Sequence, residues 1–202
     1  MARRICPRCG SRKVAQILWG LPYFSEGLQK KLENETIHLG DCCITGEDPK
    51  YYCNICKKHF GAPTKQFEED VIMIKVLIGG FLSGYKTIEV SKTDHGAIVK
   101  SMYSLLNCDD SSKNEKEVSN VQWEKLVSIL FRCNIVDWEK EYYSPNILDG
   151  EQWELEVLYC MREPLRVFGS NKYPPHFSKF RKLINNLLNF VENETGPQQI
   201  FL

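Results

Sequence analysis

Four cysteines arranged as two C-x-x-C pairs are the residues of this sequence best suited to chemistry. The pairs are Cys6 with Cys9 and Cys53 with Cys56, and 43 residues separate them. A gap of two residues lets the chain turn so that both thiolates of a pair face one ion, at about 2.3 Å for zinc. Together the pairs offer four thiolates, the tetrahedral ligand set of a structural zinc site. The spacing therefore predicts one zinc ion per chain.

The predicted zinc is structural rather than catalytic, because four thiolates leave no coordination position open for water or a substrate. Such a site contributes about 10 kcal/mol or more to folding. A single pair is also compatible with a redox dithiol, but two pairs in one chain favour zinc. The odd total of nine cysteines and the lack of a secretion signal argue against a disulfide framework.

Four further residues close to the pairs are alternative metal ligands. They are His38, Cys42, Cys43 and His59, and any one of them could replace a cysteine. Because the two pairs already complete the site, we expect Cys42 and Cys43 to pack beside the metal as small apolar residues. We expect His59 to lie at the surface.

Basic residues flank both pairs and could form a surface for nucleic acid phosphates. They are Arg3, Arg4, Arg8, Arg12, Lys13, Lys57 and Lys58. Aromatic residues lie nearby in the sequence, namely Trp19, Tyr51, Tyr52 and Phe60, so bases could stack beside the phosphates. In the competing interpretation, the aromatic side chains form a small core and the cations offset the charge of a four-thiolate site.

No catalytic motif is recognisable in the sequence, which lacks a P-loop and the G-x-G-x-x-G, H-E-x-x-H and G-x-S-x-G patterns. An enzyme would need a site assembled from dispersed residues, and the best candidates are Tyr173 and His176, in a loop that also contains Ser170 and Asn171. The competing interpretation is a rigid connector between a strand and a helix. The turn residues Asp94-His95 are expected at a hairpin tip. The remaining cysteines are expected to fill the core: Cys108, Cys133 and Cys160.

The first part of the chain, residues 1–65, is predicted to be a zinc ribbon with a helical insertion. Apolar residues recur at helical spacing over 26–35, which predicts a short amphipathic helix. Tyr51-Tyr52 predict a strand that leads into the second cysteine pair. The Gly-Ala-Pro-Thr stretch at 61–64 marks the boundary to a second domain.

The second part, residues 66–202, is predicted to be an α+β domain with the order hairpin, helix, hairpin, helix. Three strands are expected over 71–78, 85–90 and 97–103, followed by a polar loop over 107–120. Ser119 and Gln122 form a capping-box pattern, so a helix begins there and runs to about Asn134.

Two further strands and a second helix complete this prediction. The strands are expected over 153–159 and 165–168, and Ser178 is expected to cap the helix that follows. The whole domain is then an antiparallel sheet covered by two helices.

The first third of the chain resembles a family of small bacterial zinc-ribbon proteins. The resemblance rests on CPRCGS, on Gly20-Leu21-Pro22 and on the stretch LGDCCITGEDPKYYCNIC over 39–56. It implies a zinc ribbon with Cys6, Cys9, Cys53 and Cys56 as ligands, and it implies no activity. The segment from Asp149-Gly150 to the terminal helix also resembles domains of bacterial proteins that have no assigned function.

Composition describes an ordinary globular protein of 202 residues, with 43% apolar and 26% charged residues. The most apolar run, residues 71–82, is too short to span a bilayer, so we expect a cytoplasmic protein without membrane contact.

The formal net charge of zero hides an asymmetry. Residues 1–65 contain eleven Lys or Arg against six Asp or Glu, a net charge of +5, and residues 66–202 contain fifteen against twenty, a net charge of −5. Opposite charge predicts that the two parts dock on each other.

Taken together, these patterns predict a zinc-binding, non-enzymatic recognition protein. A protein partner is favoured over nucleic acid, because the larger domain is acidic and the basic surface is small. Nucleic acid binding through the ribbon is the second hypothesis, and an enzyme with a site near Tyr173 and His176 is the third.

Overall fold

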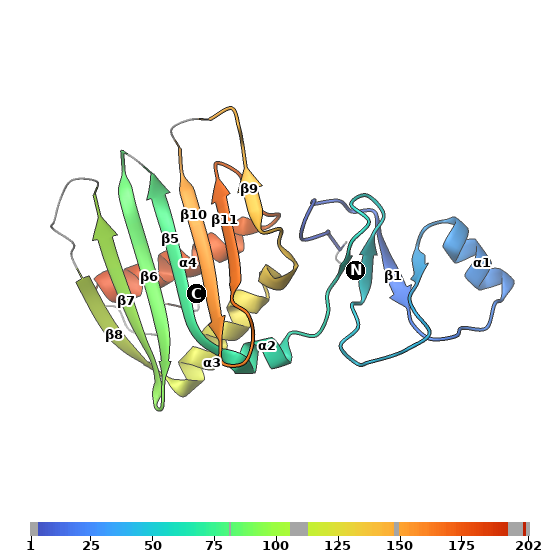
Figure 1. The fold of residues 1–202 in the computed structure, drawn as a ribbon, viewed down its shortest axis with the longest axis horizontal. Coiled ribbons are helices and arrows are strands. Elements are labelled where there is room, and N and C mark those ends of the chain that lie inside the picture. The colour runs from blue at the N-terminus through green and yellow to red at the C-terminus, as the bar shows by residue number, and fades with distance from the viewer. Residues whose placement is uncertain (1–3, 81, 106–112, 148–149, 194–199, 201–202) are drawn as a thin grey trace. The chain divides into compact units, whose positions relative to one another are not determined.

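The structure is a computed structural model that describes residues 4–80, 82–105, 113–147, 150–193 and 200 (Figure 1). The chain divides into two compact units, Met1–Thr64 and Lys65–Leu202. We call them unit 1 and unit 2 and describe each by itself.

Unit 1 is built on a small four-stranded sheet. Its strands are β1 (Val14–Leu18), β2 (Ile37–Leu39), β3 (Tyr51–Cys53) and β4 (His59–Phe60), in the order β2-β1-β3-β4. β1 pairs with β2 in parallel and with β3 antiparallel, and β3 pairs with β4 antiparallel. The buried apolar side chains in its described part are few: Cys6, Pro7, Ala15, Ile17, Cys53 and Phe60. So small a core gives unit 1 little hydrophobic stabilisation of its own.

Helix α1 (Glu26–Glu33) connects β1 to β2 and confirms the helix predicted over 26–35. Its N-cap is Ser25, whose hydroxyl accepts a hydrogen bond from the backbone N–H of Leu28 at 3.2 Å. Glu26 in the first turn and Lys30 and Lys31 in the last turn suit the helix dipole. None of the helix residues is buried.

Unit 2 contains a seven-stranded sheet in the order β8-β7-β6-β5-β10-β11-β9. The strands are β5 (Val71–Gly80), β6 (Gly84–Thr93), β7 (Gly96–Ser104), β8 (Lys113–Ser119), β9 (Glu141–Tyr143), β10 (Gln152–Tyr159) and β11 (Leu165–Ser170). The three predicted strands of the meander are confirmed as β5, β6 and β7, and Asp94-His95 forms the turn between the last two. The sheet is mixed rather than wholly antiparallel as predicted, because β9 pairs with β11 in parallel.

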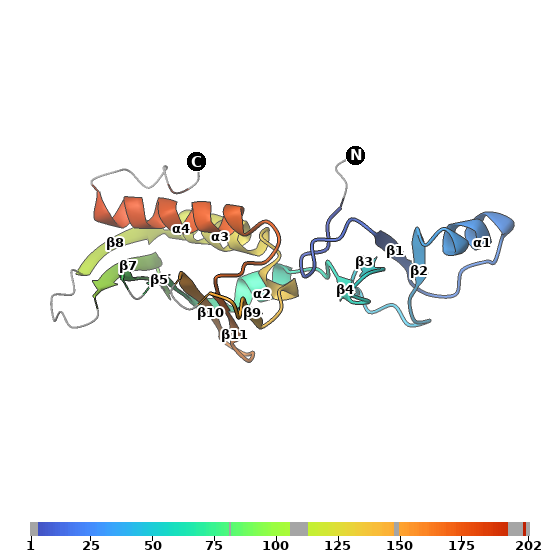
Figure 2. The ribbon, with the colours of Figure 1, turned by 90° about the horizontal axis from the view of Figure 1, so that it is seen from above.

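Two long helices cover one face of this sheet, as Figure 2 shows. They are α3 (Asn120–Phe131) and α4 (Phe177–Glu192), and the short α2 (Lys65–Asp70) and a 3₁₀ helix (Ile135–Asp137) complete the unit. Alternate strand residues and the apolar stripes of both helices form one core, in which Leu126, Trp153 and Phe180 are fully buried. The fold is therefore α+β. Among the described residues no helix is both long and apolar enough to cross a membrane.

The capping box predicted at the start of α3 is present. Ser119 is the N-cap, and the Gln122 side chain accepts a hydrogen bond from the Ser119 backbone N–H at 2.8 Å. The helix ends before Asn134, which adopts a left-handed conformation with φ of 59°.

The loop predicted over 107–120 is wrong for its second half, because residues 113–119 form strand β8. Glu115 and Glu117 alternate with Lys116 and Val118, and β8 pairs with β7 in continuous register. Lys116 reaches the helix side, where its Nζ donates hydrogen bonds to the carbonyls of Phe190, at 2.7 Å, and Asn193. The other half of the predicted loop lies outside the described residues.

The start of α4 differs from the prediction by one to two residues. The helix begins at Phe177 and its N-cap is His176, in a left-handed conformation with φ of 64°, whereas Ser178 was predicted to cap it. Phe177 is buried against Trp153, with ring centroids 4.6 Å apart, so packing rather than a side-chain cap fixes this helix start.

Candidate metal centre

The four cysteines of the two C-x-x-C pairs lie together in unit 1. Their Sγ atoms all lie within 4.8 Å of one another. The separation is 3.7 Å between Cys6 Sγ and Cys56 Sγ, and 3.5 Å between Cys9 Sγ and Cys53 Sγ. Four sulfurs placed tetrahedrally about 2.3 Å from one zinc ion are about 3.8 Å apart, so these distances suit a metal ion at the centre.

Each pair is held by a turn with the same backbone pattern. In the first turn Gly10 N–H donates to the Cys6 carbonyl at 3.0 Å, and in the second Lys57 N–H donates to the Cys53 carbonyl at 2.9 Å. Gly10 and Lys57 close these turns with φ of 73° and 57°. The repetition places the two thiols of each pair on the same side of their turn.

The backbone of the turns favours a thiolate at the first cysteine of each pair. Burial by itself raises the pKa of Cys53, but hydrogen bonds from the backbone N–H groups of Cys56 and Ile55, together with those from the thiols of Cys9 and Cys56, lower that pKa to about 7. The pKa of Cys6 stays raised by burial although the N–H groups of Cys9 and Arg8 oppose it. Four thiols in a small volume thus provide a ready ligand set for a cation that replaces their protons.

Cys56 shows the cost of crowding thiols without a cation. Burial, followed by the neighbouring thiols of Cys53 and Cys6, raises its pKa to about 12. A second thiolate is unfavourable beside a first one unless a positive charge lies between them.

Cys42 and Cys43 do not pack beside this cluster, and the prediction that they do is wrong. Both are exposed, and their Sγ atoms lie 3.9 Å from each other. The carboxylate of Asp48 accepts hydrogen bonds from the backbone N–H groups of Thr45, at 2.7 Å, and Gly46. This local turn closes the loop just after the two exposed cysteines.

Four rings form a separate cluster in unit 1, which we call the ring cluster: Trp19, His38, Tyr52 and His59. His38 stacks on Tyr52 with centroids 3.7 Å apart and planes 4° apart. His59 is exposed, as expected, and lies 5.4 Å from the Tyr52 centroid. Burial, then the charges of His59 and Lys57, lower the pKa of His38. Neither histidine belongs to the group of thiols.

The predicted basic residues divide into two kinds. Arg4 lies over the Tyr51 ring at 4.1 Å, and Arg8 donates a hydrogen bond to the His59 carbonyl at 2.7 Å, so both contact the unit itself. Four others are exposed: Arg12, Lys13, Lys57 and Lys58. Arg3 lies outside the described residues.

No protein-family model and no curated protein matches this sequence. The resemblance to bacterial zinc-ribbon proteins therefore remains an expectation.

Tyr173 and His176, the candidates for an enzymatic site, are not joined in one. The Tyr173 hydroxyl donates to Glu151 at 2.8 Å, and Arg181 forms an ion pair with the same carboxylate. The exposed His176 side chain makes no hydrogen bond or ion pair with any residue that the structure describes. Asn171 donates only to Ser170 within this loop.

The three cysteines of the second part were expected to fill the core, and the two that the structure describes differ in burial. Cys133 is buried, and burial raises its pKa to about 11. Cys160 is exposed, so that expectation is wrong for it. Cys108 lies outside the described residues.

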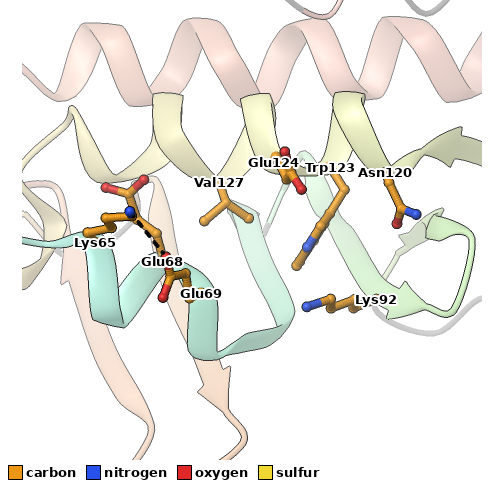
Figure 3. Close-up of a pocket in the computed structure, with 8 residues that line it drawn as sticks. All are labelled: Lys65, Glu68, Glu69, Lys92, Asn120, Trp123, Glu124 and Val127. Carbon is orange, nitrogen blue, oxygen red and sulfur yellow. Dashed lines mark ion pairs between the residues drawn. The ribbon is translucent and has the colours of Figure 1, made fainter.

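Unit 2 also has a cleft of about 390 Å³ that the sequence did not indicate (Figure 3). It is lined by Lys65, Glu68, Glu69, Lys92, Asn120, Trp123, Glu124 and Val127. These residues come from α2, β6 and α3, so only the fold brings them together. Lys65 forms an ion pair with Glu69 at 3.7 Å, and the lining contains neither histidine nor cysteine.

Proposed function

We propose that this chain is a zinc-binding recognition protein whose zinc is structural. In this proposal Cys6, Cys9, Cys53 and Cys56 bind one zinc ion, and unit 1 is a zinc ribbon with α1 inserted between the two cysteine pairs. The observation that carries the proposal is the approach of four thiols within 4.8 Å of one another. Four thiolates fill a tetrahedral site, which leaves no position for a substrate.

The metal would supply stability that unit 1 otherwise lacks. Its described core holds only six buried apolar side chains, and β4 is two residues long. A unit of this kind is held together mainly by its metal.

The test compares two cysteines of the same unit. The wild-type chain is expected to contain one zinc ion by elemental analysis, and Cys53→Ser is expected to lose it and to expose the amides of unit 1 to hydrogen exchange. Cys43→Ser removes an exposed thiol and is the matched control, with unchanged zinc content. Less than one zinc per wild-type chain, or unchanged exchange in Cys53→Ser, contradicts the proposal.

We propose that the recognised molecule is a protein, because unit 1 exposes large apolar side chains. Leu21, Tyr23 and Phe24 are 90%, 89% and 66% exposed, and Ile44, which packs beside Gly20, is 69% exposed. Leu21, Tyr23 and Phe24 lie just before α1, which itself buries nothing, and Ile44 lies in the loop after β2. Exposed apolar side chains that adjoin each other are typical of surfaces that bind other proteins.

Substitution of this apolar segment tests the protein partner. The double variant Tyr23→Ser with Phe24→Ser is expected to lose a protein that co-purifies stoichiometrically with the wild type from its native source, while zinc content stays at one per chain. Gln29→Ser, at an exposed polar position of α1, is the control and retains the partner. Equal co-purification by all three proteins removes this surface from the proposal.

Nucleic acid is the second candidate, favoured by Lys57 and Lys58, which are exposed beside the ring cluster. Lysines with neighbouring rings can hold phosphates and stack single-stranded bases. Binding of a single-stranded oligonucleotide is expected to weaken steeply with salt and to be lost in the variant Lys57→Glu with Lys58→Glu. The variant Lys30→Glu with Lys31→Glu on α1 is the matched control. No binding at about 50 mM salt, where the electrostatic contribution is strong, removes this candidate.

A further inference from the structure

The face of the seven-stranded sheet opposite α3 and α4 carries charges that alternate in sign from strand to strand. One residue comes from each of β11, β10, β5, β6, β7 and β8, and we call the set the charge row: Arg166, Glu156, Lys75, Glu89, Lys100 and Glu115. Each is the register partner of the next. Their neighbours along the strands, such as Val76 and Val90, are buried on the helix side, so the charge row points away from the core.

The two ends of the charge row are paired within the chain, whereas its centre is not. Arg166 and Glu156 form an ion pair at 2.7 Å, and Lys100 and Glu115 form one at 3.3 Å. In the described part of the chain, Lys75 makes no ion pair, and Glu89 accepts a hydrogen bond only from the Ser91 hydroxyl at 3.3 Å. The central lysine and glutamate are therefore available to a partner.

An alternating row with an even number of charges is complementary to itself. Consider a twofold axis parallel to the strands that passes between β5 and β6, and a second copy stacked face to face. The axis exchanges the two halves of the row, so Lys75 meets Glu89 of the second copy, Glu156 meets Lys100, and Arg166 meets Glu115. All six contacts are between opposite charges. A twofold axis along the row would instead place each residue opposite the same residue of the second copy, so every contact would be between like charges.

We propose that this open face binds a second copy of the chain, so that the protein is a symmetric dimer joined sheet to sheet. A twofold interface uses one patch on both subunits, and the charge row is such a patch. Beside the row, Leu158 on β10 and Ile98 on β7 are exchanged by the same axis, so an apolar contact adjoins the charges. The inference concerns unit 2 and does not depend on the metal or on the proposed recognition of a partner.

The size of the face is sufficient for this interface. Six strands about 4.8 Å apart and about eight residues long, at about 3.3 Å per residue, give a face of roughly 600 Å². Two copies would thus bury about 1,200 Å², the lower range of stable interfaces. Because packed sheets cross at about 30°, the match is closest near the axis, and the contact between Lys75 and Glu89 is the most informative one.

The decisive experiment mixes two charge reversals. Lys75→Glu leaves two glutamates at the centre, and Glu89→Lys leaves two lysines, so each variant alone meets like charges and is expected to dissociate at least about tenfold more readily. In a mixture of the two, every central contact is again between opposite charges. We expect the full-length wild type to have twice the chain mass of 23.4 kDa by light scattering, each variant to be monomeric, and their mixture to form a heterodimer.

Controls separate this interface from other effects. Lys182→Glu reverses an exposed charge on α4 and is expected to remain dimeric. Circular dichroism reports the folding of each variant, and where one does not fold, the outer pair Lys100→Glu and Glu156→Lys replaces it in the same mixing design. A monomeric wild type at concentrations up to about 100 µM, where even micromolar affinity gives a dimer, overturns the proposal. So do variants that stay dimeric, or monomeric variants whose mixture forms no heterodimer.

Discussion

A residue with positive φ closes each cysteine turn, and the two turns use different residues for it. Gly10 adopts φ of 73° and Lys57 adopts φ of 57°. Glycine accepts this conformation without a steric penalty, whereas a residue with a Cβ does so at about 1–2 kcal/mol. The residue that closes the first turn therefore suits its positive φ better than the residue that closes the second turn.

This difference gives a prediction with opposite signs in the two turns. Gly10→Ala is expected to lower the stability of unit 1 by about 1 kcal/mol, because alanine meets the steric penalty. Lys57→Gly removes that penalty and is expected to leave stability equal or slightly higher. Hydrogen exchange of the unit 1 amides in the zinc-bound protein measures both. Equal losses in both variants would show that the side chains, rather than φ, matter.

Glu151 gives a second prediction at the scale of residues. Hydrogen bonds from Arg181 lower its pKa despite partial burial, and the Tyr173 hydroxyl assists. A folded pKa below the unfolded value of about 4.3 contributes stability above that value, which is lost as pH falls through the folded pKa. Glu151→Gln is expected to cost about 1 kcal/mol at neutral pH, the low end for partly exposed charged hydrogen bonds.

The pH dependence distinguishes this ion pair from packing. The difference in unfolding free energy between wild type and Glu151→Gln should begin to shrink near the unfolded pKa of about 4.3 and should vanish as pH falls through the lower folded pKa, because Glu151 is then neutral in both the folded and the unfolded state. Glu163→Gln, at an exposed position without an ion pair among the described residues, is the control and should show no difference at any pH. If Glu151→Gln lowers the unfolding free energy by the same amount at every pH, the amide disturbs the site sterically.

At the scale of elements, strand β8 depends on one lysine. Lys116 Nζ donates to the backbone carbonyls of Phe190 and Asn193 and lies 5.1 Å from the Phe190 ring centroid. It thereby joins the edge of the sheet to the end of α4. Lys116→Ala is expected to lower stability by about 1–3 kcal/mol and to speed exchange in residues 113–119, because two carbonyls lose a charged donor. Asn114→Ala is the control, and equal exchange in the two variants would contradict this role.

Some elements of the structure could be predicted from the sequence and others could not. Local sequence patterns predicted two features correctly. Ser119 and Gln122 predicted the start of α3, and the spacing of the cysteines predicted the thiol cluster. β8 was missed because its lysines and glutamates resemble a solvated loop, although only one face of an edge strand needs to be apolar. The exposure of Cys42 and Cys43 depends on the path of their loop, and the charge row depends on the register of six strands, and no local pattern encodes either of them.

At the scale of the whole molecule, the charge is divided between the two parts of the chain. The net charge of +5 over residues 1–65 and −5 over 66–202 still predicts that the two parts attract each other. After proteolytic cleavage within 61–64, the fragments are expected to elute together at low salt. They are expected to separate near 1 M salt, because the Debye length is then only about 3 Å and charges on the two fragments no longer attract each other. Separation at both salt concentrations would show that the charges do not act between the parts.

The charged composition of β8 has one more consequence, for solubility. β8 lies at one end of the strand order, so among the described strands one of its edges has no partner, and such an edge could pair with a strand of another molecule. Charged residues at positions 115, 116 and 117 oppose such pairing, and the opposite edge, β9, is only three residues long. We therefore expect the sheet to resist extension into fibrils, and removing these charges should make the protein prone to aggregation.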